Sequence, residues 1–523
     1  MLHSKQPFSR WAMSRRLFLG SAAAGACWPF LKMRLSAAPD RRVPMPNDPF
    51  QLGVASGDPS SEGIVLWTRL APDPLNGGGL PPEDIQVYWQ VAHDEGMTKI
   101  VQKGVASAAA DWAHSVHVEV DGLEPDRGYF YQFKVGNDVS PVGRTRTAPV
   151  AHQMLDRFRF AFASCQHYEA GYYTAYEHMA REDLNLVIHL GDYIYEGKAG
   201  KNNVRSHIGD EIQSLEDYRN RHALYKTDLH LQAAHAAFPW LVTWDDHEVD
   251  NNYAGELSEK LDDPAVFLQR RANAYKAYYE HMPLRRVHLP HGPHLPLYRN
   301  VSYGSLVRFS MLDTRQYRTD QPCGDKRRAP CEEVTDPEAT LLGPIQEKWL
   351  YKQLAGSQAR WNVLAQQVLV ADINRGSSTA PSYAMDSWSG YAVARTRLMR
   401  HLADHPISNP IILTGDSHSN WVNELKIDFD DPQSPTVATE FGGTSISSKG
   451  DGHVKPAKIQ KLLSENSFVK FHNDERGYVR CDLNQQKWTA DYRVVDYVTR
   501  PGAPCQTRAS FVVEDGQRGV SQA

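Results

Sequence analysis

Four apolar runs in the sequence end in side chains that can do metal chemistry. The runs are followed by Cys165, by Gly191–Asp192 with Tyr195 beyond, by Asp245–Asp246–His247–Glu248, and by Gly415–Asp416–Ser417–His418. In open α/β sheets, ligands bind outside the carboxyl ends of the strands. One acidic strand end could arise by chance, but four of them predict a common site.

The mixture of ligand types indicates more than one kind of metal ion. A thiolate from Cys165 and a phenolate from Tyr195 favour a Lewis-acidic, redox-accessible ion such as Fe³⁺. Asp246, Asp416 and a bridging Asp192 offer hard oxygens suited to Ca²⁺, Mn²⁺ or Mg²⁺. Two neighbouring ions suit phosphoryl chemistry, because they clamp the phosphate oxygens and generate a hydroxide nucleophile near neutral pH.

The segment "HLGDYIYE", residues 189–196, carries two of these ligands. Gly191 is expected to let the chain turn tightly off the strand. If the strand alternation continues, His189 points to the face opposite Asp192. We therefore leave His189 out of the site and expect Tyr193 to pack in the core.

The elements that must position these side chains follow an α/β pattern over residues 157–515. Short apolar strands such as "LNLVIHL" alternate with helix-like stretches such as "GPIQEKWLYKQLAGS", which indicates a layered α/β architecture. Residues 475–515 have the character of β-strands again and are expected to close the sheet. We assign residues 157–515 to one catalytic domain.

Residues 43–148 have the pattern of a small all-β module. Short alternating runs such as "IQVYWQVA" and "YFYQFKV" are separated by turns. The stretch "DGLEPDRGYFYQF" resembles immunoglobulin-like and fibronectin-type sandwiches, in which Tyr129 or Tyr131 would form a tyrosine corner. An N-terminal β-sandwich is therefore predicted, joined by a linker to the catalytic domain.

The N-terminus matches a twin-arginine export signal, residues 1–38. Arg15 and Arg16 precede a modest apolar segment, and Ser36–Ala37–Ala38 resembles a cleavage site. The apolar segment is shorter than the ~20 residues that span a bilayer, so a membrane anchor is disfavoured, and no other segment is long enough. We expect a monomer that uses the twin-arginine export machinery and becomes periplasmic or secreted. This route carries folded proteins, often with a metal already loaded.

Charge and composition exclude some function classes. The chain is 41% apolar and 23% charged, as in ordinary globular proteins. Removal of residues 1–38, which contain six basic and no acidic residues, takes the net charge from −5 to −11. An acidic protein argues against a general nucleic-acid-binding surface.

The cysteines of the mature chain are odd in number. Cys323 and Cys331 flank a short polar loop and suit a local disulfide, and Cys481 and Cys505 could pair across strands. Cys165 is then left over. It is either a buried free thiol or a thiolate metal ligand.

Three blocks resemble a known superfamily. "GDYIY", "WDDHE" and "GDSH" are similar to the GDxxY, GNHE and GHxH blocks of calcineurin-like metallophosphoesterases and purple acid phosphatases. With "FASC" as first block, the chain resembles PhoD-type alkaline phosphatases along nearly its whole length. The resemblance implies a four-layered αββα core that binds iron, Fe³⁺, and one or two Ca²⁺ ions.

The resemblance also implies roles for single residues. Cys165 stands where purple acid phosphatases have an iron-binding aspartate. Asp192 would bridge the ions and Tyr195 would bind iron. The remaining implied roles are Asp246 on the second metal, His247 beside the metals, and Asp416 and His418 divided between the two metals. The departures from the purple enzymes add negative charge near the divalent ion and favour Ca²⁺.

Several further candidates keep two readings. Asn251 and Asn252 add carbonyl oxygens to Ca²⁺ or cap a loop. Arg315 binds phosphate through its guanidinium fork or pairs with Asp313. For the following residues we expect packing rather than a place in the site: Gln366, Gln367, Trp388, Tyr391, His207, His222, His230 and His235.

The sequence thus predicts in-line hydrolysis of phosphate monoesters, and of diesters as well. His247 or an ordered water would assist the leaving alkoxide, and no nucleophilic serine motif of the GxSxG type is present. One alternative is a phospholipase D-like or teichoic-acid phosphodiesterase. Another is an exported metal- or phosphate-binding protein without turnover.

Overall fold

The structure is a computed structural model that describes residue 45 and residues 47–452 and 456–523. The predicted export signal lies outside the described residues. No helix among the described residues is long and apolar enough to cross a membrane.

The larger sheet contains ten strands in the order β24-β23-β22-β21-β9-β10-β11-β1-β2-β5. Its central strands β9, β10, β11 and β1 run parallel, whereas β21 on one side and β2 on the other are antiparallel to them. The bounds are β1 Val54–Gly57, β2 Gly63–Arg69, β5 Ser115–Asp121, β9 Phe158–Ala163, β10 Leu186–His189, β11 Pro239–Val242, β21 Arg476–Leu483, β22 Lys487–Val495, β23 Cys505–Glu514 and β24 Ser521–Gln522.

The smaller sheet has seven strands in the order β12-β13-β15-β17-β19-β18-β20. Strands β13, β15, β17 and β19 are parallel, so their carboxyl ends share one edge. The bounds are β12 Arg299–Tyr303, β13 Val307–Met311, β15 Trp361–Ala365, β17 Pro410–Thr414, β18 Asn420–Lys426, β19 Thr436–Gly442 and β20 Val469–Asn473. A separate short pair joins β14, Arg327–Arg328, to β16, Tyr383–Ala384.

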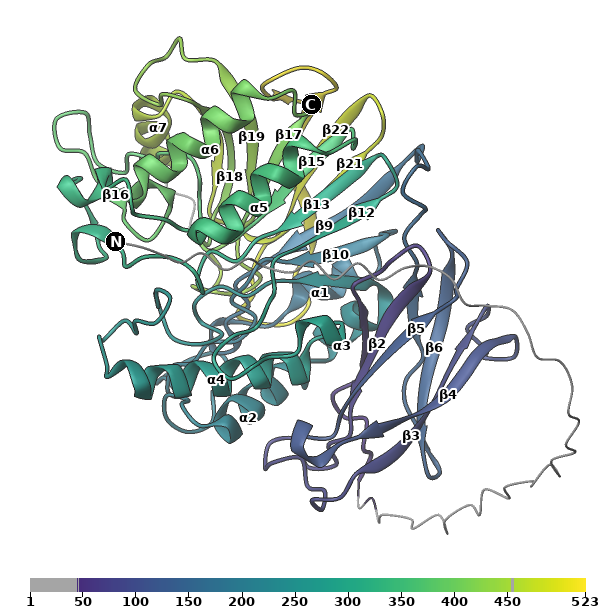
Figure 1. Cartoon of the computed structure of the whole chain (residues 1–523). Helices are drawn as coiled ribbons and strands as arrows, with labels where there is room; N and C mark the ends of the chain where they lie inside the picture. The colour runs from purple at the N-terminus through teal and green to yellow at the C-terminus, as the bar shows by residue number, and fades with distance from the viewer. Residues whose placement is uncertain (1–44, 46, 453–455) are drawn as a thin grey trace, which may run out of the picture. The chain divides into compact units, whose positions relative to one another are not determined.

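The two sheets pack face to face, with helices on both outer sides (Figure 1). In β9, Phe160 and Phe162 face the smaller sheet, whereas Ala161 and Ala163 face the helices on the other side. This alternation follows from the two-residue period of a strand. Because both faces are buried, the parallel strands have continuous apolar sequences.

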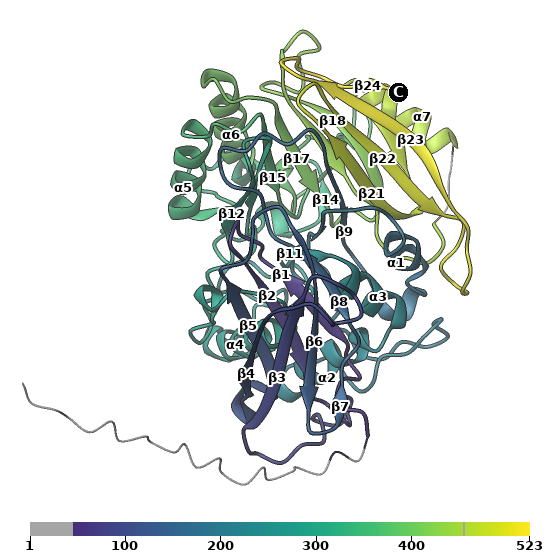
Figure 2. The ribbon, with the colours of Figure 1, turned by 90° about the vertical axis from the view of Figure 1, so that its right-hand side faces the viewer.

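Helices α1 to α4 cover the larger sheet, and α5 and α6 cover the smaller one (Figure 2). The α-helix bounds are α1 Thr174–Met179, α2 Leu215–Lys226, α3 Leu229–Ala237, α4 Pro264–His281, α5 Gly343–Ala355, α6 Ala392–Asp404 and α7 Pro456–Glu465. Short 3₁₀ turns are η1 Ala110–Trp112, η2 Tyr168–Ala170, η3 Arg286–His288, η4 Pro322–Gly324, η5 Glu332–Thr335 and η6 Trp388–Gly390. The predicted αββα layering is confirmed.

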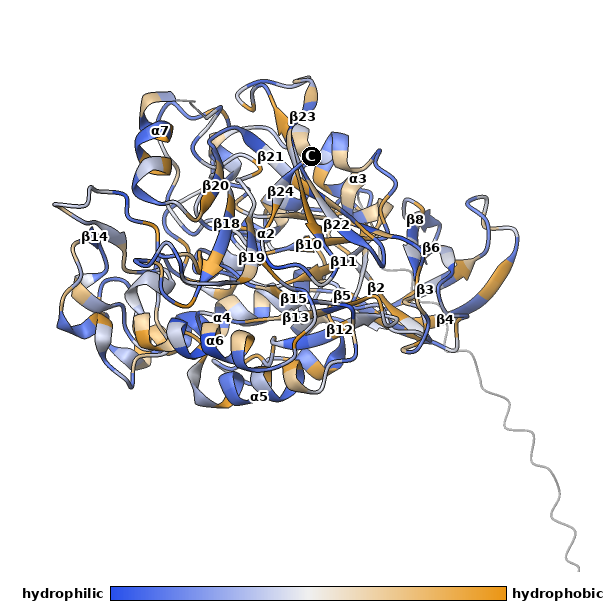
Figure 3. Ribbon diagram, turned by 90° about the horizontal axis from the view of Figure 1, so that it is seen from above, coloured by the Kyte–Doolittle hydropathy of each residue, from blue (hydrophilic) through white to orange (hydrophobic). Residues whose placement is uncertain are grey.

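Local sequence explains where these helices begin. Ser214 caps α2 and forms a capping box with Asp217, while Asp228 and Asp263 cap α3 and α4. Apolar and polar positions alternate along the outer helices (Figure 3), whereas the sequences of the parallel strands β10, β11 and β17 are largely apolar. The helices therefore bury one side against a sheet.

The N-terminal β-sandwich is also confirmed, and one of its sheets extends into the catalytic domain. One layer consists of β3 Ile85–Ala92, β4 Ile100–Ala108, β6 Gly128–Val135, β7 Asp138–Val139 and β8 Gly143–Arg146. Strands β1, β2 and β5 continue the larger sheet instead, because β1 pairs parallel to β11. Of the two candidate corner tyrosines, Tyr129 forms the corner: its hydroxyl accepts a hydrogen bond of 2.9 Å from the Glu124 N–H.

One of the two disulfide predictions is correct and the other is not. Cys323–Cys331 is confirmed, but the predicted pair Cys481–Cys505 is wrong, and both of these thiols are free. Cys481 on β21 lies opposite Ala490 on β22, which lies opposite Phe511 on β23, six residues from Cys505. Six residues of strand span about 20 Å, far beyond disulfide reach. The two thiols also lie on opposite faces of the sheet.

Candidate metal centre and active site

The four predicted strand ends meet where the two sheets come together. β9 leads to Cys165, β10 to Asp192, β11 to Asp246 and β17 to Asp416 and His418. The first three strands are neighbours in the larger sheet, and β17 lies in the smaller one. Parallel alignment brings their carboxyl ends together.

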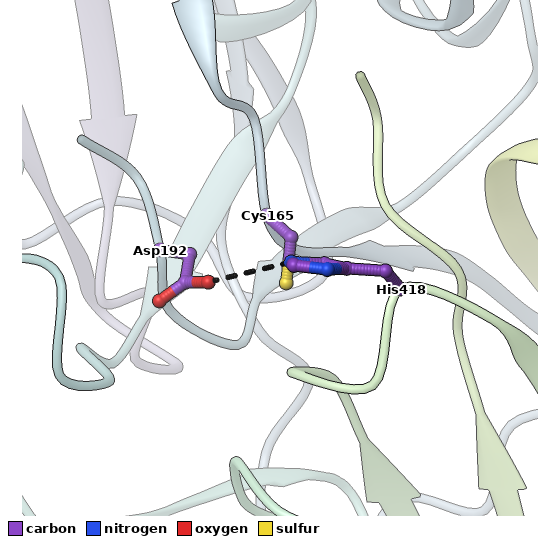
Figure 4. Close-up of side chains that lie close together, drawn as sticks. All are labelled: Cys165, Asp192 and His418. Atoms are coloured by element: carbon purple, nitrogen blue, oxygen red, sulfur yellow. Dashed lines mark ion pairs between the residues drawn. The ribbon is translucent and has the colours of Figure 1, made fainter. Parts of the chain in front are cut away.

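A first group of ligand atoms comes from Cys165, Asp192 and His418. Their sulfur, oxygen and nitrogen atoms lie within 4.8 Å of one another, and the three side chains point toward a common centre (Figure 4). His418 Nε2 is 3.9 Å from Asp192 Oδ2. The Tyr195 hydroxyl donates to Asp192 Oδ2 at 2.7 Å and lies 3.1 Å from His418 Nε2. Thiol, phenol, imidazole and carboxylate thus share one centre.

A second group consists of Asp192, Asp246 and His247, again within 4.8 Å. Asp192 belongs to both groups, which is the position that a bridging carboxylate needs. Asp192, Asp246 and His247 line a cavity with a volume of about 340 Å³, and Asp416 and Asn251 line it as well. This cavity is called the catalytic cavity below.

Several buried polar atoms of the site have no hydrogen-bond partner within the described residues. They are Asp192 Oδ1, Asp246 Oδ1 and His418 Nδ1. Such atoms are rare in folded proteins unless an ion or water binds them. Burial, reinforced by the neighbouring carboxylates, raises the pKa of Asp192 and of Asp416 to about 7. The donor set therefore fits metal cations.

The backbone at the site is held in an unusual conformation. Cys165, Asp192, Asp416 and His418 all have positive φ, between 54° and 60°. Non-glycine residues seldom adopt the left-handed region, and such strain clusters at functional sites. Gly191 has φ 108°, and a Cβ there would meet Asp245 at 2.5 Å, so only glycine fits.

Glu248 ties two of the strand ends together. Its carboxylate accepts hydrogen bonds from the N–H groups of Asp192 at 3.1 Å, Tyr193 at 2.6 Å and Asp245 at 2.9 Å. The last residue of the "WDDHE" block therefore fixes the loop that carries Asp192. Burial and the charge of Asp192 raise the pKa of Glu248 to about 8.

His247 is positioned by a residue that sequence reasoning missed. His247 Nδ1 lies 2.7 Å from Glu196 Oε2, and Glu196 Oε1 accepts from the Asn251 N–H at 3.0 Å. The His247 ring packs on Tyr195 with centroids 4.1 Å apart. Despite burial, the charges of Glu196 and Asp246 raise the pKa of His247 well above its usual range. Glu196 directly follows the predicted ligand Tyr195 in the sequence, and this adjacency is the signal that could have identified Glu196 as a site residue.

The phosphate-binding role expected for Arg315 is not supported by the geometry. Its side chain is fully buried, and its terminal nitrogens donate to the two oxygens of Asp386 at 2.7 and 2.8 Å. Its Nε donates to Asp245, and Asp246 is 3.8 Å away. The alternative side-chain pair with Asp313 is absent as well, since only the Arg315 backbone N–H bonds that carboxylate. Arg315 instead holds the carboxylates of the "WDDHE" loop.

Three cationic side chains other than Arg315 face the catalytic cavity. Arg327 on β14 lines it together with Arg375 and Lys449, which come from two separate loops. None belongs to a sequence block that suggested chemistry, so sequence reasoning missed all three. Lys449 has a positive φ of 68°, like the ligands.

The remaining candidates pack as expected. Gln366 and Gln367 are buried and bond neighbouring strand ends, and Trp388 donates to Gln366 at 3.2 Å. His189 is buried and stacks on Trp240. Asn252, for which Ca²⁺ binding and loop capping were both expected alternatives, lines the catalytic cavity; it donates its N–H to Asp246 and its side-chain amide to Asp325. Buried residues outside the catalytic cavity include Tyr193, Tyr391, His207, His222 and His235; His230 is partly exposed.

Comparison with known proteins gives consistent matches. Residues 160–492 match the family model "PhoD-like phosphatase", and residues 36–149 match "PhoD-like phosphatase, N-terminal domain". Alkaline phosphatase D of Bacillus subtilis (strain 168) is 54% identical over 479 residues, covering 90% of this chain and 82% of that protein. A solved structure described as "Structure of PhoD" superposes with a TM-score of 0.89 at 53% identity, covering 91% and 92% of the two chains.

Proposed function

This chain belongs to the PhoD-like phosphatases, and on that basis we propose that it hydrolyses phosphate monoesters, and diesters as well, in the catalytic cavity. It is an enzyme of the alkaline phosphatase type. The observation that carries the proposal is the meeting of Cys165, Asp192, Tyr195 and His418 around buried atoms that lack partners.

The proposed metals are Fe³⁺ and one or two Ca²⁺ ions. Cys165, Tyr195 and His418 would hold the iron with Asp192, because anionic thiolate and phenolate donors suit a strongly Lewis-acidic, redox-accessible ion. Asp246, Asp416 and Asn251 would hold Ca²⁺, with Asp192 shared between the sites. When bound, such ions polarise phosphate oxygens and supply the attacking nucleophile near neutral pH.

The side chains of the chain itself complete the proposed chemistry. Glu196 holds His247 through Nδ1, which leaves Nε2 to give a proton to the leaving oxygen. Arg375 and Lys449 line the cavity and would neutralise charge on the phosphate. No covalent serine intermediate is required.

Paired substrates and metal analysis test this function. The purified protein should hydrolyse phenyl phosphate, and its activity on bis-phenyl phosphate measures the diester component. A coloured protein containing iron and calcium by elemental analysis is expected from a tyrosinate–Fe³⁺ centre. A metal-loaded protein that cleaves neither ester would refute the activity, and a colourless, zinc-only protein would refute the metals.

Export remains part of the proposal. We propose that residues 1–38 direct the folded monomer to the twin-arginine machinery and are then removed. The N-terminal sequence of the exported protein should begin just after Ala38, and gel filtration should give the mass of one chain. A mature protein that retains Arg15 and Arg16 would contradict the cleavage.

Replacement of Glu196 by glutamine is expected to lower kcat for phenyl phosphate about 100-fold, the scale of general acid–base effects. Glutamine can still accept from the Asn251 N–H but cannot hold His247 in its charged form. The matched control is Glu259→Gln, because exposed Glu259 accepts from the Asn251 side chain at 2.7 Å. Equal kcat values in both variants would exclude the role given to Glu196.

Removal of the disulfide is expected to raise KM. The Cys323–Cys331 loop carries Arg327 into the catalytic cavity, and short disulfide loops are worth about 2–3 kcal/mol of chain entropy. We expect Cys323→Ser/Cys331→Ser to raise KM about fivefold while kcat changes little. Steady-state kinetics of this variant and of the control Cys505→Ser, which lacks a disulfide partner, provide the measurement. An unchanged KM would show that the loop is ordered without the bond.

A further inference from the structure

A second cavity adjoins the catalytic cavity. Its volume is about 380 Å³, and we call it the cationic cavity. The two cavities share the wall residues Arg327, Arg375, Ser417, His418 and Lys449. The two cavities are therefore direct neighbours.

The charge of the second cavity is strongly positive. Six cationic side chains line it against the single carboxylate of Asp474, and they are Arg327, Arg375, Lys449, Lys458, Lys461 and Arg476. Lys458 and Lys461 stand three residues apart on α7, so they share one helix face. The catalytic cavity, in contrast, is lined by Asp192, Asp246 and Asp416.

These cations lack protein counter-ions. Within the described residues, no ion pair engages Arg327, Arg375, Lys449, Lys458 or Lys461. Asp474 supplies one negative charge, but its Oδ1 lies against the Ser419 hydroxyl at 2.7 Å and His472 Nε2 at 3.5 Å, and it forms no ion pair with these lysines and arginines among the described residues. Arg476 is used structurally and donates to the His418 carbonyl at 2.7 Å. The positive charge of the cavity is thus available to a ligand.

Arg375 stands at the boundary between the cavities. Its guanidinium lies 5.0 Å over the ring of the buried Trp421 and makes no hydrogen bond to any residue that the structure describes. Burial and the neighbouring Arg327 lower the pKa of Arg375 to about 10. A desolvated guanidinium with free donors is suited to a phosphate, which it can bind through two parallel hydrogen bonds.

We propose that the cationic cavity binds a second phosphate group of the substrate, so that the preferred substrates carry two phosphates joined by a short linker. This inference rests on the proposed phosphatase function of the adjoining cavity. The metal ligands receive the phosphate that is cleaved, Lys458 and Lys461 receive the second one, and Arg375 lies between them. Free inorganic phosphate has the same chemistry and is the competing occupant.

The test compares 1,3-propanediol bisphosphate with 1,3-propanediol monophosphate at low salt. The native enzyme should show a kcat/KM about tenfold higher for the bisphosphate, mainly through KM. In Lys458→Gln/Lys461→Gln this preference should fall to within twofold of unity, while kcat/KM for phenyl phosphate stays unchanged. Both lysines lie outside the catalytic cavity, so phenyl phosphate separates loss of the subsite from loss of activity.

The control is Lys103→Gln/Lys134→Gln, which makes the same charge change on the distant β3-β4-β6 sheet. It should keep the full preference for the bisphosphate. An equal rate on both substrates in the native enzyme, or a preference that survives loss of Lys458 and Lys461, would overturn the subsite. Inorganic phosphate should inhibit monophosphate cleavage competitively, and equally in the native enzyme and in Lys458→Gln/Lys461→Gln. A non-competitive effect that requires the two lysines would assign the cavity to free phosphate instead. If no substrate is cleaved by any variant, the proposed function itself fails.

Discussion

Asp192→Asn is expected to lower kcat/KM for phenyl phosphate at least about 10³-fold, the upper range for loss of one electrostatic contact in an active site. Asp192 is the one residue common to both groups of ligand atoms. Asparagine keeps the shape and can still accept from the Tyr195 hydroxyl. It removes the negative charge that a bridge between two cations requires, so metal binding and activity should fall together.

Elemental analysis and kinetics on the same sample separate the explanations. The variant should lose at least one metal ion per chain while its circular dichroism spectrum remains native. Asp138→Asn provides the matched control, because Asp138 lies on β7 of the N-terminal sandwich, outside the catalytic cavity. Full metal content with near-normal turnover would remove Asp192 from the centre and would make the convergence of the two groups incidental.

Strand ends could be predicted from sequence because their signal is local. An apolar run marks a buried parallel strand, and the first polar residues after it mark its carboxyl end. Cys165, Asp192, Asp246 and His418 all follow this pattern, and the structure brings them to one place. The two-residue period of a strand was also sufficient to leave His189 out of the site.

Residues that reach the site from irregular loops carry no such signal. Asp386 and Arg375 lie far along the chain from the ligands, and nothing periodic surrounds them. The predicted pair Cys481–Cys505 failed for a related reason, since strand register depends on pairing that a single strand does not reveal. The pairing of β1 with β11 likewise joins segments about 180 residues apart.

Burial decides how the charges of this site are used. Asp245 and Arg315 are both essentially inaccessible to solvent and balance each other. Among the described residues, no arginine or lysine forms an ion pair with the carboxylates of Asp192 and Asp416, so these carboxylates are suited to bind metal cations. Beside them, the side chains of the cationic cavity that form no ion pair among the described residues are suited to bind anions. The catalytic cavity is therefore suited to cations and the adjoining cationic cavity to anions. A metal-bound substrate with more than one phosphate would satisfy both.

Arg315→Met is expected to destabilise the protein by about 3–5 kcal/mol, the usual cost of breaking a buried ion pair from one side. The substitution leaves Asp245 buried without its cation, whereas Asp386 keeps its ion pair with Arg318. Thermal unfolding should shift to clearly lower temperature, and activity should fall with it because the loop that carries Asp246 loses its anchor at the neighbouring Asp245. Arg400→Met, on the exposed side of α6, should leave the melting temperature unchanged.

Adding Asp245→Asn to Arg315→Met distinguishes a role in holding buried carboxylates from a phosphate-binding role, because Asp245 has its ion pair with Arg315. In the double variant one unpaired buried charge is gone, so part of the lost stability should return although no guanidinium is present. A phosphate ligand would behave in the opposite way, with a raised KM, an unchanged melting temperature and no rescue by Asp245→Asn. That outcome would restore the role that the sequence suggested for Arg315. Recovery of stability without recovery of the guanidinium would establish that Arg315 acts on the site by holding its carboxylates.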